Sequence, residues 1–429
     1  MPSVDVVVGA QRGDEGKGRI TDLLAPDYHI IARGNGGANA GHTVSVKGMQ
    51  SIALHQIPSG IIHKGKLNII GNGCFVDPLA LADEIEDVSK SGIEITPNNL
   101  IISDSAHLVL PHHVLLDRKR ESGKKAQGST KSGIAFIARD KALREGLRTE
   151  EIIEKSDGEL LSIVAAKLKS ALGNSEAALN HHIKLAKAWV EAAKELAPFL
   201  NDTAQIINSS LDQGKKVLAE GAQGHWLDIN HGMYPMVTSS STTAGGILEG
   251  LGIPPNKIGK VIGVVKAIKS HVGEGPFVTE ITDKNLADTI RGNARDIDSE
   301  YGSTTGRARR IGFFDLVELR RAIQASGITE IALTKLDQVG RYGKTTKIAT
   351  EYELNGESIN LAPASALKLS QCRPKYQTIK TWEEDISNIR EYKDLPTEAQ
   401  AFVKIVEKAL DTPIRTIGVG PERNQVITK

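Results

Sequence analysis

The segment Gly13-Asp14-Glu15-Gly16-Lys17-Gly18, close to the start of the chain, has the composition of a phosphate-binding loop. Glycines let backbone N–H groups approach phosphate oxygens closely, and a lysine adds a positive charge. The Walker A pattern is incomplete, because Gln11 replaces its first glycine and Gly18 replaces the Ser or Thr that normally holds magnesium. A carboxylate in such a loop repels phosphate unless it holds a metal ion or takes a proton. The segment therefore predicts a catalytic role for Asp14 rather than a tight turn with surface charges.

A second glycine-rich segment runs from Asn35 to Thr43 and contains both an amide side chain and an imidazole. The imidazole of His42 could donate a hydrogen bond to a developing oxyanion or to a transferred phosphoryl group. The alternative is a loop histidine without a role. The glycine-rich setting favours the functional interpretation.

The segment Thr334-Lys335-Leu336-Asp337 directly follows an apolar run and has features suited to a guanine site. An aspartate there can accept hydrogen bonds from N1–H and from the 2-amino group, a donor pair that adenine lacks. Gly418-Val419-Gly420-Pro421 also follows an apolar run and could complete a base pocket, although it could equally be a simple turn. Together with the phosphate loop, the two segments favour GTP over ATP.

The segment 302–310 concentrates hydroxyl groups and arginines between glycines. Arginine suits bidentate contacts to carboxylate and phosphate, so we expect a second, anionic ligand here. A solvated face or an RNA-binding patch is the alternative. Further polar loops lie at 220–224 and 237–246, and the segment 128–133 resembles an anion nest.

Several of these loops follow short apolar runs, as after Val4–Val8 and Tyr28–Ala32. Further strand-like runs are Leu67–Ile70, Leu100–Ser103, Lys216–Ala219, Lys260–Ile268, Ile328–Leu333 and Pro413–Ile417. Asp77-Pro78 begins a helix, and residues 149–213 are rich in helical periodicity. Strands that alternate with helices predict an α/β fold with a largely parallel central sheet flanked by helices. Ligands of such sheets bind at the carboxyl ends of the strands, where these loops lie. We expect one domain over residues 1–429, with a helical insertion at about 149–213.

The composition is that of an ordinary globular chain, with 429 residues, 40% hydrophobic and 24% charged residues, and a net charge of +1. A balance this even argues against wholesale binding of nucleic acid or of a membrane surface. Cys74 and Cys372 have no CxxC partner, so we expect free thiols. The opening Met1-Pro2-Ser3 lacks a basic n-region, and no apolar run reaches the ~20 residues of a membrane span. We expect a cytoplasmic protein.

The motifs G-D-E-G-K-G, N-A-G-H-T, E-G-A-Q-G, V-T-S-S, T-T-G-R and T-K-L-D occur in one order along the chain. In this the chain resembles the adenylosuccinate synthetase family across essentially its whole length, with a P-loop-like GTP-binding fold. The resemblance implies a ligase that uses GTP and Mg²⁺ to join L-aspartate to IMP. The products would be adenylosuccinate, GDP and phosphate, in AMP biosynthesis. The sequence departs from the common family pattern at Arg12, Ala38, Ser132, Ala308 and Gly418.

The resemblance also implies roles for single residues. Asp14 would deprotonate IMP and bind magnesium together with Gly41, and His42 and Lys17 would stabilise the transferred phosphoryl group. IMP would contact Asn39, Thr130, Gln223, Thr238 and Arg307, and also Arg144 from the partner subunit of a homodimer. The aspartate substrate would contact Val272, Ser303, Thr304, Thr305 and Arg307. GTP would contact Gly13, Glu15, Gly16, Lys17, Gly18, Gly41, Thr43, Arg309, Lys335, Asp337, Gly418 and Gly420.

Three alternatives stay open at this point. Phage relatives act on dGMP and make the 2-amino analogue of adenylosuccinate, but those carry a small residue in place of the loop aspartate that is Asp14 here. A regulatory GTP-binding protein would usually carry a complete Walker A motif. An RNA-binding module would use the arginines from Arg307 to Arg310, and its RNA affinity would fall steeply with salt.

Overall fold

The computed structural model describes residues 3–44, 52–124, 126–172, 176–294, 296, 298–302 and 306–429. For residues 42–44, 172 and 176–179 it describes the backbone only.

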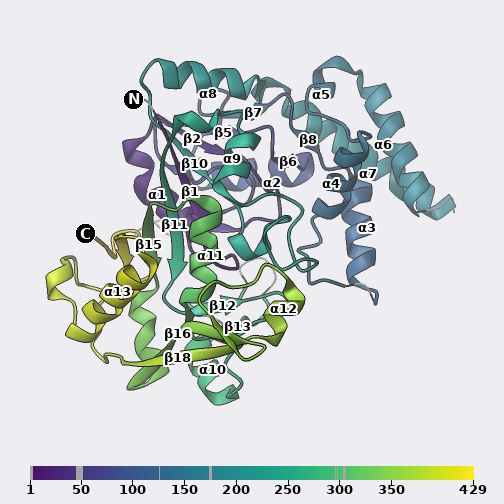
Figure 1. The fold of residues 1–429 in the computed structure, drawn as a ribbon. Helices are drawn as coiled ribbons and strands as arrows, with labels where there is room; N and C mark the ends of the chain where they lie inside the picture. The colour runs from purple at the N-terminus through teal and green to yellow at the C-terminus, as the bar shows by residue number, and fades with distance from the viewer. Residues whose placement is uncertain are drawn as a thin grey trace.

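A ten-stranded sheet forms the centre of the molecule (Figure 1). Its strands, in spatial order, are β20 (Val426–Thr428), β19 (Ile414–Gly418), β15 (Glu330–Thr334), β11 (Ile258–Lys266), β1 (Val4–Gly9), β10 (Val217–Glu220), β2 (Ile30–Arg33), β5 (Leu67–Ile70), β7 (Leu100–Ser103) and β9 (Leu200–Asn201). Every pairing in this sheet is parallel except that of β19 with β20. The expected α/β class with a largely parallel sheet is therefore confirmed.

Alternate side chains of β1 enter different cores, as the two-residue period of a strand requires. Val6 and Val8 pack in a large core with residues of α8 (Thr203–Asp212), α9 (Ala244–Gly250), α11 (Leu316–Ser326) and α13 (Thr397–Leu410). Val7 packs in a second core with Ile20 of α1 (Lys17–Leu24). Helices thus cover both faces, and β1 is buried on both sides.

Helices α2 (Pro78–Lys90), α3 (Pro111–Glu121), α4 (Ile134–Leu143), α5 (Glu151–Glu154), α6 (Asp157–Leu172) and α7 (Glu176–Glu195) gather beside β5 and β7, and all of them except the more central α2 lie on the right in Figure 1. Asp77 caps α2 by accepting a hydrogen bond from Ala80 N at 3.4 Å. The fully buried Trp189 of α7 donates to the carbonyl oxygen of Val109 at 2.9 Å and so ties the helices to the sheet region.

A second, smaller sheet lies at the lower edge of Figure 1. It contains β14 (Phe314–Asp315), β16 (Thr345–Leu354), β17 (Glu357–Ile359) and β18 (Arg373–Lys380). No strand was predicted from the sequence in this part of the chain. The reason is visible in β18, where exposed and half-buried residues alternate and no apolar run marks the strand.

The remaining elements are short. They include β3 (His42–Val44), β4 (Ile52–Leu54), β6 (Phe75–Val76), β8 (His107–Leu108), β12 (Lys269–His271), β13 (Arg310–Gly312), α10 (Lys284–Arg291) and α12 (Ala366–Gln371).

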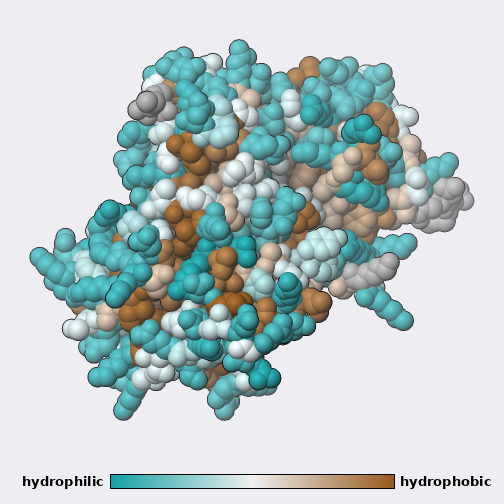
Figure 2. All heavy atoms as spheres, viewed as in Figure 1, coloured by the Kyte–Doolittle hydropathy of each residue, from teal (hydrophilic) through white to brown (hydrophobic). Residues whose placement is uncertain are grey.

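The molecular surface is mainly hydrophilic on the face shown in Figure 2, where hydrophobic residues form separate patches. Both cysteines are free and buried, as the sequence predicted. Among the described residues, no helix is both long and apolar enough to cross a bilayer.

Candidate active site

The phosphate loop connects the end of β1 to the first turn of α1, which begins at Lys17. Glu15 organises this loop from inside. Its fully buried carboxylate accepts hydrogen bonds from Gly13 N at 2.8 Å and Gln11 N at 3.1 Å, and pairs with Lys17 Nζ at 2.7 Å. A Cβ on Gly9 would lie only 2.5 Å from Glu15 Oε2, so a glycine is required beside this carboxylate. The side chain of Glu15 therefore serves the loop, and any contact it makes with a nucleotide would come from its backbone.

Asp14 is exposed to the pocket, in contrast to Glu15. Its backbone has φ 57°, a left-handed conformation that Asp tolerates better than most residues. Its carboxylate is 35% exposed, and Oδ2 lies 3.0 Å from Arg309 Nε. Burial acts to raise the pKa of Asp14, but the charges of Arg309 and Lys266 outweigh it, and the pKa falls below its ordinary value. Asp14 is thus ionised at neutral pH and able to accept a proton or hold a cation.

A buried cluster of charged side chains lies beneath Asp14. Glu300 is completely buried and pairs with Arg309 at 2.8 Å, with Lys266 at 3.5 Å and closely with Lys335. Burial alone would raise the pKa of Glu300, but Lys266, Lys335 and Arg309 hold it well below its ordinary value. Glu300 therefore orients two cations that border the pocket.

Neither Lys266 nor Glu300 was predicted from the sequence as a site residue. Lys266 ends β11 and is fully buried, so a charged residue inside an apolar run was the available signal. Glu300 lies just before the predicted 302–310 loop, and nothing in its local sequence shows that it folds back under Asp14.

A cavity of about 950 Å³ opens in front of the phosphate loop. Loops that follow several strands of the central sheet line it, as expected for a parallel sheet. It brings together fourteen residues that the sequence predicted for the site: Gly13, Asp14, Gly16, Lys17, Gly18, Asn39, Gly41, Thr130, Gln223, Thr238, Val272, Arg307, Arg309 and Lys335.

Two amide side chains in this cavity carry polar atoms without a protein partner among the described residues. Both the Oε1 and the Nε2 of Gln223 are buried and unpaired, and Gln223 has φ 59°. Asn39 Nδ2 donates to Thr238 Oγ1 at 3.3 Å, while its buried Oδ1 has no partner in the same part of the chain. Buried polar groups in native proteins are almost always hydrogen-bonded, so these atoms point to a polar ligand.

The predicted guanine segment lies at the carboxyl end of β15. Lys335 has φ 59°, lines the cavity and donates to the carbonyl oxygen of Asp298 at 3.2 Å. Asp337 Oδ1 is buried and has no hydrogen-bond partner within the described ranges, and burial raises the pKa of Asp337. Gly418 is the last residue of β19, which pairs with β15, and a Cβ on Gly418 would lie 3.4 Å from the Cα of Thr334. The two predicted halves of the base pocket are therefore adjacent.

Several predicted residues fall elsewhere. The side chains of His42 and Thr43, and the residues Ser303, Thr304 and Thr305, lie outside the described parts of the chain. Within the described parts, the cavity lining does not include Glu15, Arg144, Asp337, Gly418 or Gly420. Arg144 is exposed, at the carboxyl end of α4.

The segment 128–133, which resembled an anion nest, is held by two carboxylates of α3. Glu121 accepts hydrogen bonds from the backbone N–H groups of Gln127, Gly128 and Ser129 at 2.9, 2.8 and 3.1 Å. Asp117 accepts a hydrogen bond from Gly133 N at 3.0 Å. The nest therefore exists, but a side chain of the protein itself occupies it.

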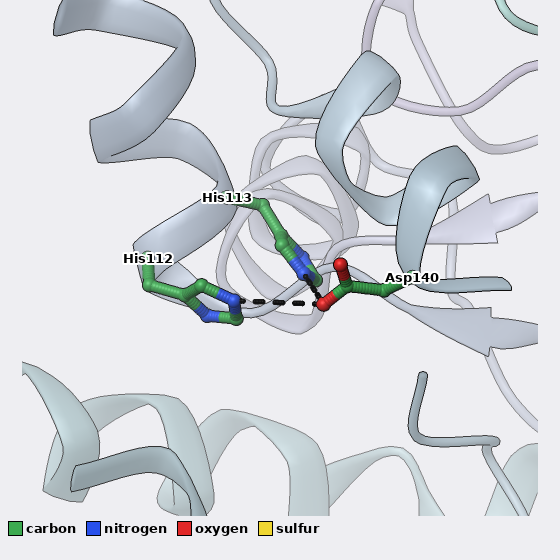
Figure 3. Close-up of side chains that lie close together, drawn as sticks. All are labelled: His112, His113 and Asp140. Atoms are coloured by element: carbon green, nitrogen blue, oxygen red, sulfur yellow. Dashed lines mark hydrogen bonds and ion pairs between the residues drawn. The ribbon is translucent and has the colours of Figure 1, made fainter. Parts of the chain in front are cut away.

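His112, His113 and Asp140 lie close enough together to suggest a metal site (Figure 3). However, His113 Nδ1 accepts a hydrogen bond from Leu110 N at 3.0 Å, so the proton of this ring lies on Nε2, 3.1 Å from Asp140 Oδ2. Burial lowers the pKa of His113 to about 4, and the ring is neutral. Arg139 also pairs with Asp140 at 2.8 Å. A cation at Nε2 would have to displace this hydrogen bond beside an existing positive charge, so the cluster is a hydrogen-bond network that joins α3 to α4.

Arg12, next to the phosphate loop, belongs to another buried network. Its Nη2 lies 2.5 Å from Glu318 Oε1, and its guanidinium packs 4.9 Å from the centre of the Phe277 ring. Glu318 also pairs with Lys269 at 2.8 Å, and Lys269 pairs with Asp315 at 2.7 Å. Burial opposes ionisation of Glu318, but Arg12 and Lys269 lower its pKa to about 2.

We expect the substitution Arg12→Met to lower the free energy of unfolding by about 3–5 kcal/mol, because it removes one partner of a buried charge. The double variant Arg12→Met/Glu318→Gln should recover part of this loss. The contribution of ionised Glu318 should be complete above its unfolded pKa of about 4.3 and decline as pH falls towards 2. Urea denaturation across this pH range measures both effects. Equal unfolding free energies for wild type and Arg12→Met would contradict the network.

The fold and the site together define a nucleotide-binding α/β enzyme with a carboxylate at its phosphate loop. Residues 6–427 match the adenylosuccinate synthetase family. Adenylosuccinate synthetases of Clostridium botulinum (strain Loch Maree / Type A3) and Clostridium kluyveri are 43% and 44% identical, each over 99% of both chains. A fully ligated adenylosuccinate synthetase from Plasmodium falciparum has a TM-score of 0.90 at 34% identity, and all of both chains is covered.

The chain therefore belongs to the adenylosuccinate synthetase family, and it is a ligase that forms a carbon–nitrogen bond. A cyanophage S-2L succinoaminodeoxyadenylate synthetase bound to dGMP and dATP is also similar, with a TM-score of 0.60 and 19% identity over 100% of this chain and 95% of that one. At that identity the likeness concerns the fold alone.

Proposed function

We propose that this ligase joins L-aspartate to IMP at the expense of GTP, giving adenylosuccinate, GDP and phosphate in AMP biosynthesis. The observation that carries the proposal is the difference between the two carboxylates of the phosphate loop. Glu15 is buried and holds the loop, whereas Asp14 is ionised and faces a cavity with unpaired amide groups. A carboxylate in that position suits proton transfer beside a bound phosphate chain.

In the proposed reaction, Asp14 removes the proton from N1 of IMP, and the 6-oxygen becomes an oxyanion. This oxygen attacks the γ-phosphorus of GTP, and GDP leaves. The amino group of aspartate then attacks C6 and phosphate departs with the 6-oxygen. The backbone N–H groups of the loop, Lys17 and the first turn of α1 would stabilise the phosphoryl charge, together with His42.

A low pKa makes Asp14 a weak base, so the oxyanion it creates needs stabilisation. Mg²⁺ fits this requirement, because Asp14 offers an ionised oxygen and Gly41 lines the same cavity, and oxygen ligands are those that Mg²⁺ prefers. When bound, Mg²⁺ would neutralise charge on the nucleotide phosphates. Asp14 and Gly41 would hold the Mg²⁺ ion.

IMP would occupy the part of the cavity lined by Asn39, Thr130, Gln223, Thr238 and Arg307. The aspartate substrate would lie near Val272 and Arg307, and we keep Ser303, Thr304 and Thr305 as proposed contacts. GTP would extend from the phosphate loop past Arg309 and Lys335 to Asp337, Gly418 and Gly420, with Thr43 as a further proposed contact. Arg144 would reach the IMP site of the partner in a homodimer, and we propose a cytoplasmic location.

The substitution Gln223→Met tests the IMP site. We expect the KM for IMP to rise about tenfold, because Met cannot pair with the polar purine edge, while the KM for GTP stays unchanged. Gln400→Met is the matched control, since it makes the same change on α13, where Gln400 donates to two carbonyl oxygens and does not line the cavity. Steady-state kinetics with each substrate varied in turn gives the answer. A rise in the KM for GTP alone would contradict the assignment, because Gln223 would then contact GTP and not IMP.

The competing function, the use of dGMP in place of IMP, is tested by assay of purified protein with GTP, aspartate and either nucleotide. The proposal predicts that product forms with IMP and that dGMP is a poor substrate, because the loop carries Asp14 where the relatives that use dGMP carry a small residue. Preferential use of dGMP would overturn the assignment of the substrate.

A further inference from the structure

An unusual set of contacts joins α1, the helix that follows the phosphate loop, to the loop 418–425 near the end of the chain. Arg19 lies on the first turn of α1 and donates from Nη1 to the carbonyl oxygen of Gly420 at 2.5 Å. Its Nη2 donates to the carbonyl oxygens of Glu422 at 2.6 Å and Gln425 at 2.9 Å. One guanidinium thus holds three carbonyl groups of a single loop.

A second contact lies one turn further along the same face of α1. The side chain of Asp22 is fully buried, and both of its oxygens accept hydrogen bonds from Arg423 at 2.6 Å. His63 Nε2 lies 2.7 Å from Asp22 Oδ1 on the other side and fixes the carboxylate. Residues three apart on a helix share a face, so Arg19 and Asp22 both bind the loop from the same face of α1.

The loop held in this way borders the proposed guanine pocket. It follows β19, whose neighbour β15 leads directly into Lys335 and Asp337. A Cβ on Gly418 would lie 3.4 Å from Arg19 Nη1 and 3.4 Å from the Cα of Thr334. Arg19 itself lines the cavity. Arg19 therefore touches the point where the two halves of the pocket meet.

Hydrogen bonds within the loop 418–425 do not hold the loop against α1. Val419 N donates to the carbonyl oxygen of Gln425 at 2.9 Å, and Glu422 N donates to the side-chain Oε1 of Gln425 at 2.9 Å. These bonds close the loop upon itself but do not connect it to the helix. Loss of Arg19 would leave the loop's shape largely intact but remove three of its contacts to α1, so that the pair of Asp22 with Arg423 alone would hold Gly418 and Gly420 less firmly.

We propose that Arg19 is a positioning residue that fixes the loop 418–425 as one wall of the guanine pocket, so that a single helix sets both the phosphate and the base ends of the GTP site. The inference rests on the proposed use of GTP. A guanidinium so near a phosphate loop could instead bind phosphate directly, but both of its Nη groups donate to the loop carbonyls, and its buried Nε has no partner among the described residues. The two roles predict different kinetics.

The test compares Arg19→Met with Arg320→Met. Arg320 is a matched control, because it also donates to three carbonyl oxygens, those of Thr350, Asn360 and Ala409, on α11 away from the cavity. For Arg19→Met we expect the KM for GTP and the Kd for GDP each to rise about tenfold, as the base loses a fixed wall. The kcat at saturating GTP and the KM values for IMP and aspartate should stay near those of the wild type. Arg320→Met should change none of these constants, although its stability can fall.

An unchanged Kd for GDP in Arg19→Met would overturn the inference. A loss of kcat at saturating GTP with an unchanged KM would also overturn it, since that is the result expected of a residue that contacts the transferred phosphoryl group. The GDP measurement separates this inference from the proposed function. If wild-type protein binds GDP but forms no product from IMP and aspartate, the proposed function fails while the role of Arg19 is still decided by GDP binding.

Discussion

The substitution Asp14→Asn should lower kcat for adenylosuccinate formation roughly 10³-fold, the scale expected when a general base is lost. Asn keeps the shape of Asp and tolerates the left-handed backbone at this position, where φ is 57°. The melting temperature should therefore stay close to that of the wild type. The measurement is the rate of product formation with saturating GTP, IMP and aspartate, together with thermal unfolding by circular dichroism.

The control for this variant is Asp385→Asn, which changes an aspartate that is fully exposed and far along the chain from the loop. It should keep wild-type activity. If Asp14→Asn retained a substantial part of the wild-type rate, Asp14 could not be the group that removes the proton from IMP. The ion pair with Arg309 would then be purely structural.

The second large effect is expected at Asp337, whose buried Oδ1 lacks a protein partner in the described chain. Asp337→Asn should lower kcat/KM for GTP by about 10²-fold or more, because the amide N–H₂ would face the N–H groups of guanine. The kcat/KM for XTP should rise relative to that for GTP, because xanthine carries a carbonyl at C2 to which an amide can donate. The measurement is kcat/KM for both nucleotides.

The KM for IMP serves as the internal control for Asp337→Asn, and it should not change. An unaltered ratio of GTP to XTP use would remove the guanine assignment. It would leave the ligase reaction itself untouched, since Asp337 lies outside the residues that line the cavity.

Eight of the ten strands of the central sheet were predictable because they are short apolar runs with β-branched residues, whereas the short edge strands β9 and β20 were not predicted. Leu67–Ile70 and Leu100–Ser103 occupy the residues predicted for them. Other strands are displaced by one or two residues, as in β2, where Ile30–Arg33 forms the strand instead of Tyr28–Ala32. The displacement has a local cause, because Tyr28 ends a short turn and donates its hydroxyl to Asp5 at 2.5 Å.

The smaller sheet and the charge cluster were not predictable in the same way. Strands such as β18 lie at the surface and carry alternating polar residues, so that hydrophobicity does not reveal them. The role of Glu300 depends on contacts with Lys266 and Lys335, which are distant along the chain and meet only in the fold. Local sequence thus identified fourteen of the residues that border the cavity, but not the buried charges that orient two of them.

The most direct test of the proposed mechanism follows the 6-oxygen of IMP. IMP labelled with ¹⁸O at position 6 is incubated with wild-type protein, GTP, Mg²⁺ and aspartate, and the phosphate released is analysed by mass spectrometry. If Asp14 generates an oxyanion that attacks GTP, each phosphate formed must carry one labelled oxygen. Unlabelled phosphate released together with adenylosuccinate would contradict the account, because the 6-oxygen would then have left without ever bonding to phosphorus.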